Sequence, residues 1–157
     1  MRVFAATALA AAVLLPSSAF AGTNSSTFKV TTTVNAACQL SPNDINLSAY
    51  DPTSSTALTG SSTLAVTCTK GTTATLSFSS PNATGQVMKM KGAAKADLLS
   101  YGLYSDAGAT TSVIGANLQV TSTDGTAKSV QIYAKVGAGQ QVNADGYSDT
   151  VTVTAAF

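Results

Sequence analysis

The sequence predicts an all-β protein built as an antiparallel β-sandwich, and three observations predict it. After an apolar start, apolar residues recur at every second position, the period that places alternate side chains on one face of a strand. Clusters of turn-forming residues, such as Ser80-Pro81-Asn82 and Asp124-Gly125, separate these runs at short intervals. Threonine and valine, which favour strands, are frequent, and helical periodicity is nearly absent. Short strands at this spacing are typical of a sandwich rather than of alternating strands and helices.

The first 21 residues have the pattern of a secretory signal peptide. Arg2 gives a positive start, residues 5–15 form an apolar run, and Pro16 ends it. Residues 19–21 (Ala-Phe-Ala) supply the small-residue pattern that signal peptidase reads. The apolar run is too short to span a bilayer. We therefore predict that residues 1–21 are cleaved on export; a buried N-terminal helix is the alternative.

The charge balance argues against binding of nucleic acid or anionic lipid. The chain carries eight Lys and Arg against seven Asp and Glu, and it has no His. Because Arg2 lies in the predicted signal, the exported chain has no net charge, and a neutral surface does not attract polyanions. Such a low charge is unfavourable for a free monomer but unremarkable in a polymer.

Signals of catalysis and of metal binding are weak. The chain has neither His nor Glu, and no serine or lysine stands in an activating motif, so we predict no enzymatic activity. No metal or other cofactor is predicted either. Asp145 and Asp149 suggest calcium, but the ligand spacing of a defined loop is missing. Sequons at Asn24, Asn46 and Asn82 are attributed to chance in a chain this rich in Ser and Thr.

The cysteines Cys38 and Cys68 are the two in the chain. An even pair in an exported protein is most simply one disulfide. It would close a loop of about 30 residues and stabilise the fold by roughly 3–4 kcal/mol. Metal binding and redox chemistry are weaker alternatives, because the chain has no Cys-x-x-Cys motif and no histidine.

Strand periodicity appears in six segments along the chain. In order, they are residues 28–36, 64–68, 74–78, 99–103, 130–136 and 150–157. Between them, the lysine-bearing residues 85–95 are expected to form a mobile loop, and residues 93–99 are compatible with one helical turn.

The two ends of the exported chain are unusual for a self-contained sandwich. Only Ala37 separates residues 28–36 from Cys38, so this run has to leave the domain or fold sharply back. At the other end, the last apolar residue of the final strand, Phe157, is also the last residue. We therefore expect a sandwich that lacks its closing strand.

Four segments, in this order, resemble the spore coat protein U family, which includes the subunits of archaic chaperone–usher pili. They are the extended run leading into residues 37–40 (Ala-Cys-Gln-Leu), residues 64–68 (Leu-Ala-Val-Thr-Cys), residues 99–106 (Leu-Ser-Tyr-Gly-Leu-Tyr-Ser-Asp) and residues 146–157 (Gly-Tyr-Ser-Asp-Thr-Val-Thr-Val-Thr-Ala-Ala-Phe). No single segment is diagnostic, but the four in order after a signal peptide are fairly specific. The resemblance covers essentially the whole exported chain.

The resemblance implies an incomplete immunoglobulin-like β-sandwich, the pilin fold, with an N-terminal donor-strand extension. It divides the chain into a signal (1–21), an extension (22–37) and a pilin domain (38–157). A periplasmic chaperone would first fill the groove left by the missing strand. At an outer-membrane usher, the extension of the next identical subunit would replace the chaperone by β-strand addition. The product would be a surface pilus, joined by related minor subunits or a tip adhesin, that supports adhesion and biofilm formation.

The resemblance also assigns residues to two complementary faces. The donor face would consist of Phe28, Val30, Thr32, Val34 and Ala36. The acceptor groove would be lined by Val151, Val153, Ala155 and Phe157. Thr32 departs from the apolar pattern and would weaken one pocket or mark a shallow one.

Alternatives remain open from the residues alone. Residues 28–36 can be an ordinary first strand of their own domain, since period-two runs are common in any sandwich. The chain can also be a non-polymerising, secreted or coat-associated, lectin-like adhesin. Tyr101, Tyr104 and Tyr147 would then offer a stacking face for sugars, although packing in the core or at its rim explains them more simply.

Overall fold

The computed structural model describes residues 21–157, which divide into two units, residues 21–33 and Val34–Phe157. The predicted signal peptide lies outside the described residues, apart from Ala21. Residues 21–33 contain no helix or strand, and their side chains are exposed. Across residues 21–157 the structure offers no helical segment with the length and hydrophobicity that a bilayer crossing needs.

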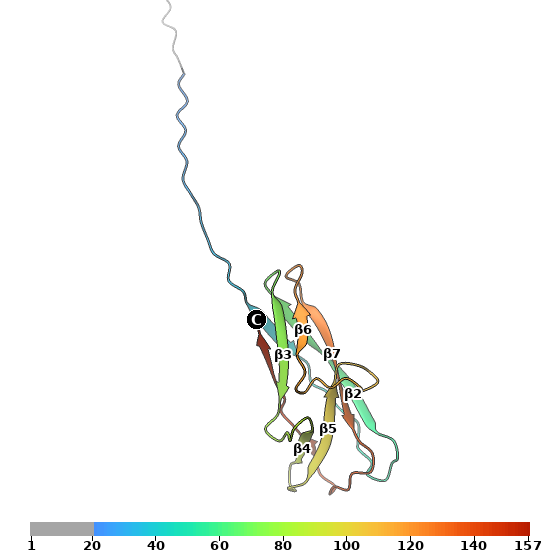
Figure 1. The fold of residues 1–157 in the computed structure, drawn as a ribbon. Helices are drawn as coiled ribbons and strands as arrows, with labels where there is room; N and C mark the ends of the chain where they lie inside the picture. The colour runs from blue at the N-terminus through green and yellow to red at the C-terminus, as the bar shows by residue number, and fades with distance from the viewer. Residues whose placement is uncertain (1–20) are drawn as a thin grey trace, which may run out of the picture. The chain divides into compact units, whose positions relative to one another are not determined.

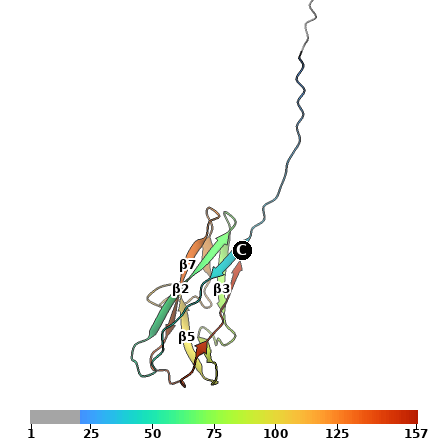
Figure 2. The same ribbon diagram turned by 180° about the vertical axis from the view of Figure 1, so that it is seen from behind.

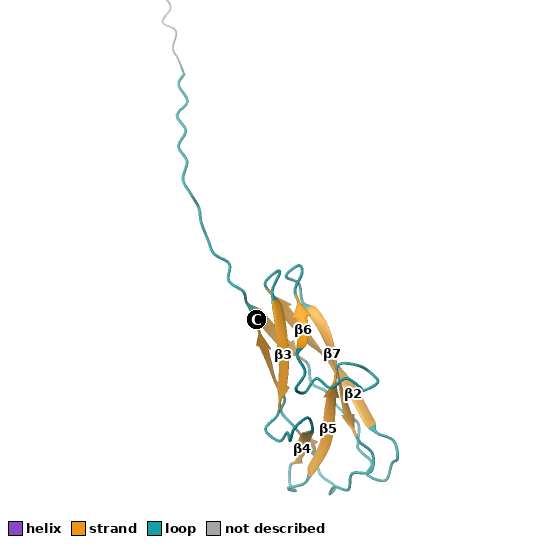
Figure 3. Cartoon of the chain, in the orientation of Figure 1, coloured by secondary structure: helices purple, strands orange, loops and turns teal. Residues whose placement is uncertain are grey.

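The second unit is an all-β sandwich (Figures 1 and 3). Its strands within the described residues are β1 (Cys38–Pro42), β2 (Leu58–Cys68), β3 (Thr73–Ser79), β4 (Met88–Gly92), β5 (Leu98–Tyr104), β6 (Leu118–Thr121), β7 (Lys128–Val136), β8 (Tyr147–Ser148) and β9 (Thr152–Ala156). They form a six-stranded sheet in the order β1-β2-β7-β5-β4-β8 and a three-stranded sheet in the order β6-β3-β9. All strand pairs are antiparallel, so the predicted fold class is confirmed.

The core lies between the two sheets and is built by the predicted alternation. The central pair is β2 with β7, in register from Leu58 opposite Val136 to Val66 opposite Lys128. In β3, Ala74, Leu76 and Phe78 are buried while their neighbours are more exposed. Each fully buried Val, Leu or Phe stabilises the fold by roughly 1.5–3 kcal/mol. The other buried apolar side chains are Leu64, Val66, Cys68, Met88, Leu99, Tyr101, Leu103, Val113, Ile114, Ile132, Ala134 and Val136.

Five of the six predicted strand segments are strands, and each lies within or overlaps β2, β3, β5, β7 or β9. The sixth, residues 28–36, is not a strand in the structure. The loop prediction for residues 85–95 is wrong at its centre, because β4 occupies Met88–Gly92 and pairs with β5. The helical turn at residues 93–99 is also wrong, because residues 93–95 form bends and Leu98 begins β5.

Candidate functional site

Four strands have one unpaired edge each within the described residues, namely β1, β6, β8 and β9, and two of them, β9 and β1, lie close together. β9 pairs with β3 alone, from Thr152 opposite Ser79 to Ala156 opposite Thr75. β1 pairs with β2 alone. The two strands belong to different sheets but approach each other where β9 ends (Figure 2). An unpaired edge presents a row of free N–H and C=O groups, which is a template for an added strand.

A cavity of about 1000 Å³ opens into the space between the sheets. Residues from both sheets line it, and so does the irregular segment that connects β1 to β2. Its apolar lining includes Ile45, Leu47, Leu58, Leu64, Phe78, Met90, Leu99, Leu103, Ile132, Ala134, Val136, Val142, Val151 and Val153. A strand that paired with the open edge of β9 would therefore point alternate side chains at apolar walls.

The predicted acceptor residues divide into three positions. Val151 and Val153 are half-buried and line the cavity. Ala155 is also half-buried and packs against the core, but it is not among the cavity-lining residues. Phe157 lies beyond the end of β9 and is 58% exposed. The structure thus brings Val151 and Val153 together in the cavity wall and leaves Phe157 outside it.

The predicted donor residues are all exposed. Phe28, Val30 and Val34 are 87%, 84% and 77% exposed, respectively. Thr32 and Ala36 are exposed too, and none of the five lies in a strand or in the cavity lining. These large apolar side chains therefore contribute nothing to the core of the described structure.

The segment that leads into β9 is anchored by a buried tyrosine. Tyr101, which is 8% exposed, donates a hydrogen bond from Oη to Asp149 Oδ2 at 2.7 Å. Asp149 Oδ1 accepts from Ser80 Oγ at 2.7 Å. Burial, and secondarily the bond to Asp149, raises the pKa of Tyr101 above its ordinary value. The hydroxyl therefore stays protonated and serves as a donor, and Tyr101 is too buried to offer a sugar-stacking face.

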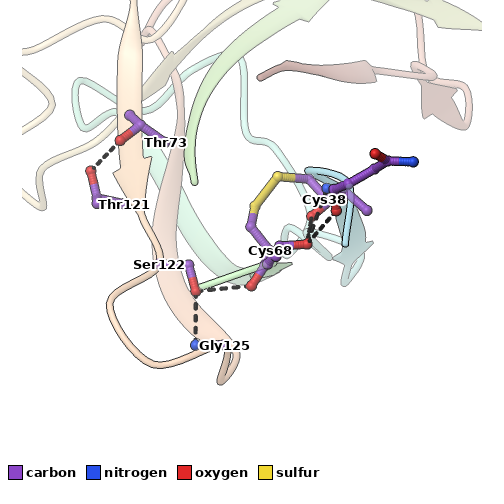
Figure 4. Close-up of a disulfide and its surroundings, with 9 residues drawn as sticks. Cys38, Cys68, Thr73, Thr121, Ser122 and Gly125 are labelled. Carbon is purple, nitrogen blue, oxygen red and sulfur yellow. Dashed lines mark hydrogen bonds between the residues drawn. A yellow bond between two sulfur atoms is a disulfide. The ribbon is translucent and has the colours of Figure 1, made fainter. Parts of the chain in front are cut away.

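The disulfide between Cys38 and Cys68 is present, which confirms the prediction, and it ties the first residue of β1 to the last residue of β2. Figure 4 shows its surroundings. Ser122 Oγ donates to the carbonyl of Cys68 at 2.9 Å and accepts from the N–H of Gly125 at 3.1 Å. Because Ser122 is only 2% exposed, these bonds satisfy a buried hydroxyl and fix this end of the sandwich.

The Spore Coat Protein U domain model matches residues 24–154. The chain belongs to this family. The match covers residues 24–37 of the extension, the disulfide and the first three of the five residues of β9, so the exposed run and most of the groove lie within one family domain. The resemblance proposed from the sequence is therefore confirmed.

Two solved structures match the chain at low sequence identity, and the first has a similar fold. A chaperone–tip adhesion subunit pre-assembly complex, CsuC–CsuE from archaic chaperone–usher Csu pili of Acinetobacter baumannii, matches with a TM-score of 0.59 and 20% identity, covering 80% of this chain and 40% of that chain. A chaperone–tip adhesin complex described for CFA/I fimbriae biogenesis matches with a TM-score of 0.41 and 14% identity, covering 75% of this chain and 41% of that chain. The chain thus spans less than half of either matched chain, and the second likeness is too distant to support a conclusion. None of the curated proteins matches the sequence.

In this Spore Coat Protein U domain, two aspartates brace loops, Asp145 and Asp97. Asp145 Oδ2 accepts from the backbone N–H groups of Lys95 at 2.7 Å and Ala94 at 2.8 Å, and these bonds lower its pKa. Asp97 Oδ2 accepts from the backbone and side-chain nitrogens of Asn143, both at 2.7 Å. In residues 21–157 no three metal-ligating side chains gather into a group. The calcium suggestion therefore has no site in the described structure.

The connection between β1 and β2 is a part of the groove that sequence reasoning missed. Ile45 and Leu47 line the cavity. Tyr50 fixes the end of this segment, because its Oη donates to the carbonyl of Gly137 at 3.0 Å and accepts from the N–H of Gln140 at 2.7 Å. The apolar alternation of Ile45 and Leu47 was the available signal, but it is too short to distinguish a loop from a strand.

Proposed function

We propose that this protein is a structural subunit of a chaperone–usher type surface pilus, assembled by donor-strand complementation. The observation that carries the proposal is the apolar cavity beside the unpaired edge of β9. Residues 28–36 of one copy would enter this groove in a second copy. The fibre would support adhesion and biofilm formation.

The energetics of strand insertion support this function. Burying Phe28, Val30 and Val34 would contribute roughly 5–9 kcal/mol before ordering costs. Each backbone hydrogen bond gained along the open edge adds about 0.5–1.5 kcal/mol. Thr32 would gain less, because its hydroxyl has to be desolvated or find a partner. The extension is thus able to bind by backbone pairing and to be selected by its side chains.

The acceptor residues play unequal parts in this proposal. Val151 and Val153 would form part of the wall that the donor side chains touch, and Ala155 packs against the core outside the cavity lining. Phe157, being exposed, would cover the inserted strand at the rim only after assembly. We infer a structural role without catalysis or cofactor, since the chain has no His and the aspartates that brace the loops already accept hydrogen bonds.

The proposed partners follow from the same groove. A free subunit with an open groove is prone to aggregation, so a periplasmic chaperone would fill it until an outer-membrane usher exchanges it for the next subunit. Export would depend on residues 1–21. Related minor subunits or a tip adhesin would complete the fibre. The family and the shared fold support these partners, and the structural neighbour from Csu pili is itself a chaperone complex.

Deletion of residues 22–35 tests the proposal in cells that express the chain with its chaperone and usher. We expect the truncated domain to be exported and to bind the chaperone, but to form no fibres visible by electron microscopy. Two full-length triple variants test whether the apolar face, rather than the length of the extension, is what matters. Serine at all three large apolar positions, Phe28, Val30 and Val34, should also abolish fibres. Serine at the three intervening positions, Lys29, Thr31 and Thr33, should not. Normal fibres from the deletion would contradict the proposal and favour the non-polymerising adhesin.

A further inference from the structure

Thr69 contacts the residues that join the extension to the domain, next to the disulfide. Thr69 Oγ1 accepts a hydrogen bond from the N–H of Ala37 at 3.1 Å. It lies within donating distance of two carbonyls, Asn35 O at 3.3 Å and Ala37 O at 3.4 Å. The backbone N–H of Thr69 also donates to Ala37 O at 2.9 Å. Residues 35–37 are therefore bound to the end of β2 before β1 formally begins.

The local hydrogen bonding explains why the side chain of Thr69, rather than its backbone carbonyl, accepts from the N–H of Ala37. The pairing of Cys38 with Cys68 would continue with Ala37 opposite Thr69. However, the carbonyl of Thr69 accepts instead from the N–H of Thr72 at 3.0 Å, across a turn in which Gly71 has a φ of +82°. The Thr69 hydroxyl takes the place of that carbonyl as the acceptor for Ala37. Thr69 thus extends the β1–β2 ladder by one residue pair.

The turn that carries Thr69 is itself fixed. The N–H of Gly71 donates to the carbonyl of Ser122 at 2.7 Å, and the N–H of Ser122 donates to the carbonyl of Thr72 at 2.9 Å. The buried Ser122 hydroxyl also holds the carbonyl of Cys68 at 2.9 Å (Figure 4). Thr69 is therefore positioned by the sandwich and is able to impose a direction on residues 35–37.

That direction conflicts with insertion of the extension into its own groove. To lie beside the open edge of β1 or β9 in the same chain, residues 28–36 must reverse direction before Cys38. A tight hairpin needs residues that tolerate positive φ, typically Asn-Gly. Asn35 meets this need, but Ala36 and Ala37 do not. The reversal would also break the bonds of Ala37 and Asn35 to Thr69.

We propose that Thr69 is a positioning residue that keeps the extension out of its own groove and leaves it for the groove of a second copy of this chain. This inference rests on the proposed function, because it assumes that residues 28–36 are the strand that fills the groove. It adds a residue that determines whether the extension fills the groove of its own chain or the groove of a second copy. Loss of the hydroxyl should favour closed monomers at the expense of chains of subunits.

The test uses the exported chain, residues 22–157, with its disulfide intact. The protein is unfolded in guanidinium chloride and refolded by dilution, and its assembly state is measured by size-exclusion chromatography with light scattering. Groove occupancy is measured by the fluorescence anisotropy of a labelled peptide of residues 24–36. Thr69→Val loses the hydroxyl bonds. In this variant, the fraction of closed monomers, which do not bind the peptide, should rise about threefold to tenfold. Thr69→Ser keeps the hydroxyl and should match the wild type, as should Thr67→Val in the neighbouring ladder position.

Two further measurements make the outcome decisive. Amide exchange at Ala37 should be faster in Thr69→Val, while the exchange of β7 amides is unchanged. Ala36→Gly places a glycine directly after Asn35 and should raise the closed monomer with Thr69 intact, which covers the case in which Thr69→Val does not refold. If the folded variants partition between monomer and multimer as the wild type does, the positioning role is wrong and the proposed function stands. If the wild type itself binds no peptide and forms no multimers, the proposed function fails.

Discussion

Residues 28–36 and residues 150–157 have the same sequence pattern, but only the second run forms a strand in the structure. Both alternate apolar and polar side chains. In the C-terminal run, β9 pairs with β3, and Val153 forms part of the cavity wall. In the N-terminal run no strand forms, and Val34 is 77% exposed. The comparison teaches that alternation specifies a face, whereas a partner edge decides whether the face is buried.

The largest expected effect comes from placing a charge on each of the two faces. Val153→Asp puts a carboxylate into the apolar cavity wall, where an unpaired charge costs several kcal/mol. We expect the variant to lose both chaperone capture and strand acceptance, measured by co-purification with the chaperone and by peptide binding. Thr154→Asp, on the exposed face of β9, is the matched control and should retain both.

Val34→Asp should block the same assembly from the other side. Its own groove is unchanged, so the variant should still accept a wild-type donor strand but should not donate one. Thr33→Asp carries the same charge on the opposite face of the extension and should assemble. Mixing each variant with wild-type subunits separates the roles by electron microscopy. If Val34→Asp and Val153→Asp both polymerise normally, the two runs are not complementary.

The disulfide is expected to have the next largest effect, because it anchors the junction to the extension. Replacing Cys38 and Cys68 together by Ser should lower the free energy of unfolding by roughly 3–4 kcal/mol, as expected for a closed loop of about 30 residues. Urea unfolding of the full chain measures this loss, and reductant should have no further effect on the double variant. A thiol titration that finds free thiols in the denatured, unreduced wild type would contradict the bridge.

The segment before β9 is anchored by the hydrogen bond between Tyr101 and Asp149, and a substitution at Tyr101 tests this anchor. Tyr101→Phe removes a hydrogen bond to the Asp149 carboxylate and should lower the free energy of unfolding by about 1.5–3 kcal/mol. Tyr104→Phe is the control, because within the described residues the Tyr104 hydroxyl has no hydrogen-bond partner. Equal stability losses in the two variants would show that the anchor contributes little.

The smallest expected effect is the dependence of stability on pH, which should appear only at acidic pH. Hydrogen bonds, first those of Thr126, lower the pKa of Asp124 to about 2. Hydrogen bonds also lower the pKa values of Asp51, Asp106 and Asp145. A carboxyl group whose pKa is lowered on folding stabilises the fold at pH values above its ordinary pKa near 4. That contribution is lost as the pH falls toward about 2. Thermal unfolding should therefore be nearly independent of pH between about 5 and 9, since no His titrates, and the midpoint should fall below about pH 4.

The long strands could be predicted from the sequence because each carries at least three alternating apolar residues. β4 was missed although Met88 and Met90 alternate with lysines, because the lysine density suggested a loop. The strands β6 and β8 are short, and β1 ends at Pro42, so none of them offers a run long enough to count. All three lie at sheet edges, where strands are commonly short, and their shortness makes them hard to predict.

The candidate site could be predicted only in part. The face shared by Val151 and Val153 follows from alternation, and the structure places both in the cavity wall. Phe157 follows the same alternation but lies past the last residue of β9, where nothing holds it against the core. Tyr50, Thr69 and Tyr101 were beyond prediction, because their hydrogen bonds join residues far apart in the chain, as the bond between Tyr101 and Asp149 illustrates.

The position of the disulfide has a mechanical consequence. A pulling force applied to the extension reaches the domain at Cys38 and passes through the sulfur atoms into Cys68, at the end of β2. β2 is paired with β7 from Leu58 to Val66, so a force that enters at Cys68 is carried by that ladder as well as by the hydrogen bonds of β1. In the proposed fibre, the covalent link would therefore pass load from the extension to the longest strand pair of the sandwich.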